Sequence, residues 1–291
     1  MSLLHSGHGG TADIAATAAT SPAAGSQDHA TPSASRAAQS PSPRPTTASP
    51  KPTPTVSTAG VRRALAAAEG HASVAAVDLT TGQGLAVGGG GHRFVDASIS
   101  KADILATLLL QAQDRGRGLT SGQRALATRM IQNSDNSAAN SLYGEIGGAS
   151  GMAAANKRFG MTATTPGAGG LWGLTTTTAK DQLVLLRNLF TSESKLSAAS
   201  RGYVAGLMAT VETDQRWGVS AAASGDDYAL KNGWLPRSGT GLWVVNSIGR
   251  VVRDGHTLLI AAVSDGNPTE AQGIALVESA ARAAGQALTG G

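Results

Sequence analysis

The residues best suited to chemistry are Ser98 and Lys101, which lie where the spacing of apolar residues becomes helical. Apolar side chains after Lys101 recur every three or four residues, which predicts a helix over 99–115. A serine at its start and a lysine one turn later share one face. The serine hydroxyl needs a base, and a lysine whose pKa is lowered by burial and by the helix dipole can serve. An isolated Ser-x-x-Lys, however, is far more often a helix cap with a solvated lysine.

A second short motif, Ser134-Asp135-Asn136, separates two helical patterns. The Ser134 hydroxyl is a candidate proton relay to a leaving group. The Asn136 amide is a candidate contact for both a substrate amide and Lys101. By itself, Ser-Asp-Asn is simply a helix-capping turn.

The third motif, Lys231-Asn232-Gly233, lies on a predicted strand. Lys231 would offer a fixed positive charge to a substrate carboxylate, and Gly233 would let a ligand approach the backbone closely. The alternative is an ordinary turn, because Asn-Gly is a strong turn signal.

The three motifs together, in this order, form a known signature, and over about 60–290 the chain resembles the class A β-lactamase-like serine hydrolases. The resemblance implies that Ser98 is the nucleophile and Lys101 its base. It implies that Ser134 relays a proton and that Asn136 contacts the substrate.

The same resemblance assigns the late strand to substrate binding. It implies that Lys231 and Asn232 bind the substrate carboxylate beside Gly233. The backbone N–H groups of Ser98 and Trp234 would form an oxyanion hole. Arg216 is a candidate for a second positive charge near this strand, or else a surface residue.

The sequence also departs from the class A pattern. Asn232 replaces the usual Thr or Ser, and the interval from Ser98 to Ser134 is short, which predicts a more open site. The stretch 160–178 contains no acidic residue, whereas class A β-lactamases carry there the Glu that activates water for release of the acyl group. Loss of a positioned base costs roughly 10²–10⁴-fold in rate. The Ala- and Gly-rich stretch is expected to be mobile.

The order of the predicted elements indicates an α+β fold of the β-lactamase/transpeptidase type. A helix over 60–69 precedes a hairpin over 72–88, and an all-helical subdomain follows with helices over 99–115, 120–132, 136–146, 150–159, 177–190 and 196–210. Strands over 228–233, 241–252 and 256–264 and a helix over 268–288 complete the chain. We expect one antiparallel sheet flanked by the terminal helices.

Composition divides the chain into a linker and a domain. Eight of the 11 prolines precede residue 58, so 1–57 is predicted to be a disordered Pro/Ala/Ser/Thr-rich linker and 58–291 the hydrolase domain. No run of residues is long enough for a membrane span, and no signal peptide is visible. Such a tether is nevertheless typical of proteins held outside a cell, so we expect an extracellular or cell-surface protein.

Other partners are not expected. The net charge is only +4 and the basic residues are scattered, which argues against nucleic-acid binding. Cysteine is absent, and His71, His92 and His256 lie far apart without carboxylates at ligand spacing. We therefore expect no metal and no cofactor, and a monomer.

The predicted activity is acylation of Ser98 by β-lactams or related amides and esters, with slow release. The alternatives are a D-alanyl-D-alanine peptidase-like enzyme acting on peptidoglycan-type peptides, or a cell-wall or penicillin-binding module without turnover.

Overall fold

The computed structural model describes residues 56–290. The predicted linker, 1–57, lies almost wholly outside these residues. The elements, in chain order, are α1 (Ala59–Leu65), β1 (His71–Asp78), β2 (Gly84–Gly88), β3 (Phe94–Val95), η1 (Ala97–Ile99), α2 (Ser100–Asp114), α3 (Ser121–Gln132), α4 (Asn136–Glu145), α5 (Gly148–Phe159), η2 (Trp172–Leu174), β4 (Thr176–Thr177), α6 (Ala179–Phe190), α7 (Ala198–Met208), η3 (Thr213–Gln215), η4 (Gly218–Ala222), β5 (Tyr228–Pro236), β6 (Trp243–Arg253), β7 (His256–Asn267) and α8 (Glu270–Thr289).

The two strand groups predicted from the sequence join in one sheet. Its order is β2-β1-β7-β6-β5 and every neighbouring pair is antiparallel. The first hairpin therefore meets the last strand, and β5 is left at a free edge. The short strands β3 and β4 form a separate pair, which the sequence pattern did not predict.

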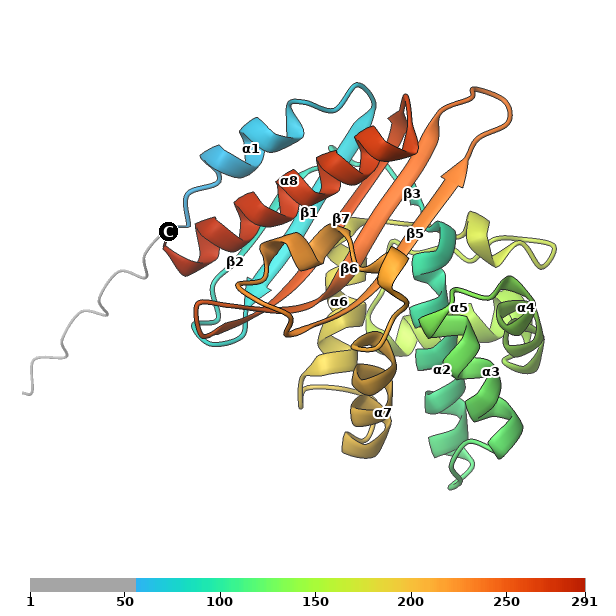
Figure 1. Ribbon diagram of the computed structural model, residues 1–291. Coiled ribbons are helices and arrows are strands. Elements are labelled where there is room, and N and C mark those ends of the chain that lie inside the picture. The colour runs from blue at the N-terminus through green and yellow to red at the C-terminus, as the bar shows by residue number, and fades with distance from the viewer. Residues whose placement is uncertain (1–55, 291) are drawn as a thin grey trace, which may run out of the picture. The chain divides into compact units, whose positions relative to one another are not determined.

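Helices cover both faces of the sheet. The terminal helices α1 and α8 lie side by side over one face, and the helical block α2–α7 lies on the other side (Figure 1). The side chains of β7 alternate between the two faces of the sheet, so this strand contributes to the apolar clusters on both sides. Leu258, Ile260 and Ala262 belong to the apolar cluster under α8, whereas Leu259 and Ala261 belong to the cluster of the helical block.

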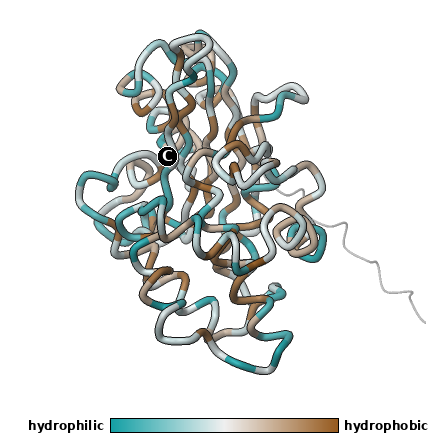
Figure 2. Tube along the Cα trace, turned by 90° about the vertical axis from the view of Figure 1, so that its right-hand side faces the viewer, coloured by the Kyte–Doolittle hydropathy of each residue, from teal (hydrophilic) through white to brown (hydrophobic). Residues whose placement is uncertain are grey.

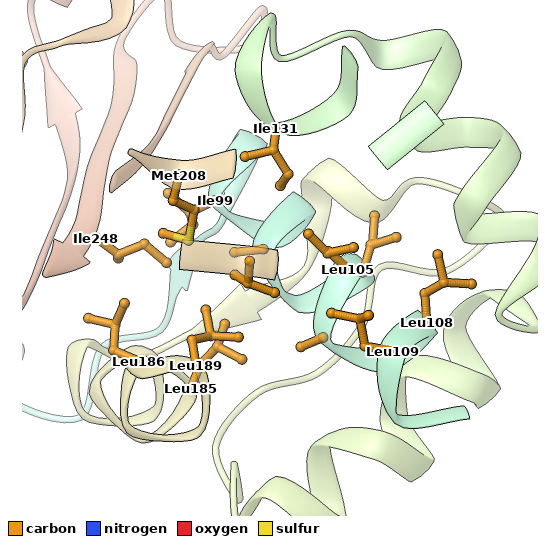
Figure 3. Close-up of a cluster of buried hydrophobic side chains, with 14 of the residues drawn as sticks. Ile99, Leu105, Leu108, Leu109, Ile131, Leu185, Leu186, Leu189, Met208 and Ile248 are labelled. Atoms are coloured by element: carbon orange, nitrogen blue, oxygen red, sulfur yellow. The ribbon is translucent and has the colours of Figure 1, made fainter. Parts of the chain in front are cut away.

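The helix α2 lies at the centre of the apolar cluster of the helical block. Twelve of its fifteen residues are buried, so it packs against neighbours on all sides rather than on one stripe. Leu105 and Leu109 meet side chains from α3 and α6, and Ile99 at its start lies near Ile248 of the sheet (Figure 3). Hydrophilic segments of the trace gather in the outer turns, as the hydropathy colouring shows (Figure 2).

Most predicted boundaries hold within two or three residues. The exception is the first helix, predicted over 60–69, which ends at Leu65 because the chain must turn before β1. Gly70 lies there against β7, where an added Cβ would stand 2.2 Å from the backbone oxygen of Asp265.

Candidate active site

A tight turn presents Ser98 at the start of α2. Ser98 lies in the 3-10 turn η1, and the residue before it, Ala97, has a φ of +50°. A left-handed conformation at a non-glycine residue costs roughly 1–3 kcal/mol and is found mostly where function requires it. No side chain caps the start of α2, and the N–H of Ile99 donates to the backbone oxygen of Asp96 at 3.3 Å within the preceding turn.

Lys101 lies one turn below Ser98 and is completely buried. Its Nζ donates to Ser98 Oγ at 2.9 Å, to Ser134 Oγ at 3.0 Å and to Asn136 Oδ1 at 2.7 Å. Burial lowers the pKa of Lys101 from 10.5 to about 8, against the opposing effect of the nearby Asp135 carboxylate. With this pKa, about a tenth of the amine is neutral at pH 7, and this is the form that could serve as a base for Ser98.

Ser134 links the two buried lysines. Its Oγ accepts from Lys101 Nζ and from Lys231 Nζ, each at 3.0 Å. Ser134 has a φ of +55°, and Asp135 caps α4 by accepting from the N–H of Ala138 at 2.6 Å. Burial, and then the positive charge of Lys101, hold the pKa of Lys231 well below its usual value. The three sequence motifs thus meet at one hydroxyl.

The free edge of β5 runs past Ser98. The backbone oxygen of Asp227 accepts from the N–H of Val252 in β6, and the N–H of Arg237 donates to the oxygen of Leu242 just before β6. Between these two bonds, residues 228–236 pair with β6 in an uninterrupted register. The N–H and C=O groups of successive residues point to opposite sides of a strand. The odd-numbered residues of β5 therefore direct these groups to β6, and the even-numbered residues direct them to the free edge. The N–H of Trp234 therefore points to the free edge, on the side where Ser98 lies.

Gly233 permits this close approach. A Cβ at Gly233 would stand 2.7 Å from the backbone nitrogens of both Ser98 and Ile99 and 2.8 Å from the oxygen of Asp96. Any larger residue would push the edge strand away from the turn. The N–H groups of Ser98 and Trp234 are consequently held as neighbours, the arrangement that an oxyanion hole requires.

The side chains of Asn232 and Trp234 lie on the face of β5 that is turned away from Lys231. Asn232 is fully buried, and its Nδ2 donates to the backbone oxygens of Gln215 at 2.8 Å and Trp217 at 3.1 Å. The pleat turns Asn232 and Trp234 to the face opposite Lys231, where the Trp234 ring packs edge-on against Trp217 at 5.7 Å. The amide donors of Asn232 are thus engaged by the backbone, and its binding of a substrate carboxylate stays a prediction.

Arg216 is exposed, and its Nε donates to the backbone oxygen of Val211 at 3.1 Å. No contact ties it to Ser98 or Lys231. Arg237 is a positive charge that the sequence pattern did not indicate. It directly follows β5 and lines a hollow with Leu174 and Leu235. The sequence pattern could not indicate Arg237, because only the folded chain brings the end of β5 next to Leu174.

The loop between α5 and α6 covers Lys101 with an indole. Trp172 is buried, its ring lies 4.8 Å from Lys101 Nζ, and its Nε1 donates to Asn140 Oδ1 at 2.7 Å. Hydrogen bonds tie this loop to its neighbours. Asp181 accepts from the N–H of Ala163 at 2.7 Å, and Thr165 pairs with Thr176 in both directions.

No carboxylate takes the place of the missing loop glutamate within 56–290. Asp135 contributes its Oδ1 to capping α4, and Asp181 is bonded within the loop. Glu145 accepts from Gln123 on the exposed side of the helical block. Trp172 packs over Lys101, with its ring centroid 4.8 Å from Lys101 Nζ.

Residues 113–288 match the beta-lactamase enzyme family, and this match takes in more than half of the chain. The chain belongs to the beta-lactamase enzyme family. The matched range includes Ser134 and Lys231, which meet in the site, but begins after Ser98 and Lys101.

Solved structures of this family show the same fold. A beta-lactamase from Chitinophaga pinensis has a TM-score of 0.66 and 20% identity, and the match covers 77% of this chain and 96% of that one. A beta lactamase from Burkholderia vietnamiensis has a TM-score of 0.66 and 21% identity, over 80% and 96% of the two chains. The protein PBP-A has a TM-score of 0.66 and 21% identity, over 79% and 94%.

Relatives by sequence are found in mycobacteria. The proteins named "Putative lipoprotein LppW" of Mycobacterium tuberculosis and Mycobacterium bovis are each 29% identical over 169 residues, which is 56% of this chain and 54% of theirs. The chain thus spans about half the length of the curated relatives it matches.

Proposed function

We propose that this protein is a serine hydrolase in which Ser98 is acylated by β-lactams or related amides and esters, and from which the acyl group is released slowly. The observation that carries the proposal is the contact of 2.9 Å between Lys101 Nζ and Ser98 Oγ. The lowered pKa of Lys101 makes this amine a base rather than a fixed cation.

Acylation follows from the contacts of the two lysines and Ser134. Neutral Lys101 takes the proton of Ser98 Oγ as this oxygen bonds to the lactam carbonyl carbon. The negative charge on the carbonyl oxygen is stabilised by the N–H groups of Ser98 and Trp234. The proton then passes from Lys101 through Ser134 Oγ to the lactam nitrogen as the carbon–nitrogen bond breaks.

The substrate would lie along the free edge of β5. Lys231 supplies positive charge behind Ser134, and its Nζ is also bonded to the backbone oxygen of Asn232 at 2.9 Å. Asn136 is exposed, and because its Oδ1 accepts from Lys101, its Nδ2 faces outward for a substrate carbonyl. The hollow lined by Leu174, Leu235 and Arg237 suits an apolar or acidic acyl side chain.

Release is expected to be slow because Trp172 displaces water from Lys101. An ester at Ser98 needs an activated water on one face of its carbonyl. Trp172 occupies the neighbouring space, with its indole fixed by Asn140. The acyl-enzyme should therefore accumulate rather than turn over.

The test is intact-mass spectrometry of the full chain after exposure to benzylpenicillin, followed over hours. The expected result is one added penicilloyl mass, mapped to Ser98 and lost slowly. Ser98→Ala should show no adduct, whereas Ser220→Ala, which alters a serine bonded only to Arg216 in a 3-10 turn, should behave as wild type. Absence of an adduct on wild type refutes the proposal.

The packing of Trp172 over Lys101 favours a second candidate function. With Trp172 in place, the site also suits a cell-wall or penicillin-binding module without turnover, or a D-alanyl-D-alanine peptidase-like enzyme that releases only its own peptide. Retention of a peptidoglycan peptide by both wild type and Ser98→Ala, with hydrolysis by neither, would support the module. Rapid loss of a D-alanyl peptide adduct but not of penicillin would support the peptidase.

We also propose a place in the cell envelope, at the surface or outside the cell. The support is the Pro/Ser/Thr-rich stretch over 1–57 and the lipoprotein names of the mycobacterial relatives. Within the described residues no helix is long and apolar enough to cross a membrane.

A further inference from the structure

A second cluster of reactive side chains lies outside the serine site. His71 begins β1, His92 follows the glycine run after β2, and Asp265 lies near the end of β7. The expectation that the histidines lie apart is wrong for His71 and His92. The pairing of β1 with β7 sets His71 opposite Asp265, and the glycine loop returns the chain to the same place.

The three side chains converge on one point. His92 Nε2 lies 2.6 Å from Asp265 Oδ2, and His71 Nδ1 lies 3.4 Å from Asp265 Oδ1. The two imidazole rings are stacked, with centroids 3.8 Å apart and planes 9° from parallel. One ligand atom from each residue lies within 4.8 Å of the others, and among residues 56–290 this is the one group of three such side chains that meets this condition.

The backbone is built to hold His92 there. Gly88, Gly89, Gly90 and Gly91 all have positive φ, between 47° and 90°, a run that only glycine adopts without strain. The N–H of His92 donates to the oxygen of Gly89 at 2.6 Å, and its ring packs edge-on against Phe94 at 4.7 Å.

We propose that His71, His92 and Asp265 bind a zinc ion, with water completing the coordination. Two imidazole nitrogens and a carboxylate oxygen are ligands that Zn²⁺ prefers. Bonds of about 2.1 Å in a tetrahedron set ligand atoms roughly 3.4 Å apart. His71 Nδ1 and Asp265 Oδ1 already lie at this separation, whereas His92 Nε2, at 2.6 Å from Asp265 Oδ2, would have to move outward by less than about 1 Å. His71 is 62% exposed, so its ring is free to rotate off the stack and direct Nδ1 to the ion.

The chemistry of the cluster favours a cation over simple ion pairs. One carboxylate, that of Asp265, faces both imidazole nitrogens. A single divalent ion satisfies both nitrogens and the carboxylate at once. His256 provides the contrast, because its Nδ1 meets Asp78 Oδ2 at 2.8 Å with no second imidazole among the described residues near it.

The test is isothermal titration of the untagged full chain with ZnCl₂, together with the visible absorption of the Co²⁺-substituted protein. His71→Ala, His92→Ala and His256→Ala would be compared, all of which keep His5, His8 and His29 of the N-terminal segment. His71→Ala alters a largely exposed side chain and so leaves folding intact.

We expect one site whose affinity falls at least about 100-fold in His71→Ala and in His92→Ala, since even changes to residues behind the ligands cost about 10–100-fold. His256→Ala should match wild type, and both should gain the Co²⁺ bands of an imidazole-ligated site, which His71→Ala and His92→Ala should lack. Equal affinity in wild type and His71→Ala, or no Co²⁺ bands in wild type, would overturn the proposal and leave only His–Asp ion pairs. Acylation of Ser98 by penicillin is measured separately and does not bear on this outcome.

Discussion

The pH dependence of Ser98 acylation measures directly whether Lys101 is the base. The neutral amine is the active form, so the rate should rise with pH and level off above the pKa of Lys101. Burial without a salt-bridge partner sets this pKa at about 8. The direction and the position of the plateau are both fixed by the structure.

The expected magnitude follows from the fraction of neutral lysine. With a pKa of about 8, that fraction rises roughly tenfold between pH 7 and pH 9 and very little beyond. A solvated lysine, with a pKa near 10.5, would instead give a rise of about 100-fold over the same range and no plateau. The two cases differ by an order of magnitude and in the shape of the curve.

The assay is the second-order rate constant for acylation by a fluorescent penicillin between pH 6 and pH 10. Lys101→Arg keeps the charge but cannot release a proton at these pH values, so it should lose at least about 100-fold in rate. Lys180→Arg alters an exposed lysine at the start of α6 and should reproduce the wild-type profile. A flat wild-type profile, or a steady rise through pH 10, would refute the assignment of Lys101 as a buried base.

Three further predictions concern residues around this pair. Trp172→Glu should speed the loss of the penicilloyl adduct by about 100-fold, because it places a carboxylate beside Lys101, and Leu171→Glu on the exposed side of the loop should not; equal adduct lifetimes by mass spectrometry would contradict this. Gly233→Ala should lower the acylation rate by about 100-fold, since its Cβ would displace the Ser98 turn, with an unchanged rate counting against the close approach of β5. Burial raises the pKa of Asp103 to about 7, so its contribution to stability is present at low pH and is lost as pH rises toward 7. Between pH 5 and pH 8, urea unfolding should show wild type losing about 3 kcal/mol relative to Asp103→Asn, and parallel curves would show that Asp103 titrates normally.

Local patterns were sufficient for most of the fold. The repeat of apolar residues marked α2, α6 and α8, and alternation marked β1 and the three late strands, because each element buries a periodic face. The two-residue strands β3 and β4 could not be predicted in this way. They are too short to show a period, and only their pairing across the fold defines them.

Some features of the serine site could likewise be predicted from local spacing, and others could not. Ser98 and Lys101 lie within one turn of helix, so their spacing alone placed them together. Trp172 gave no signal, since nothing local distinguishes a tryptophan that packs in a core from one that covers a lysine. The hydrogen-bond partners of Asn232 could not be predicted, because the direction of its side chain depends on the pleat of an edge strand and on what lies behind it.

The sequence by itself determined that Lys101 lies one helical turn from Ser98, because a helical turn is a local structure and its geometry is fixed by spacing. It also determined that the loop over 160–178 carries no carboxylate, because composition does not depend on folding. Only the tertiary structure decided what occupies that position instead, and it brought His71 beside His92 and Asp265. Contacts between segments far apart in the chain arise from strand pairing and side-chain packing, and these depend on the whole fold at once.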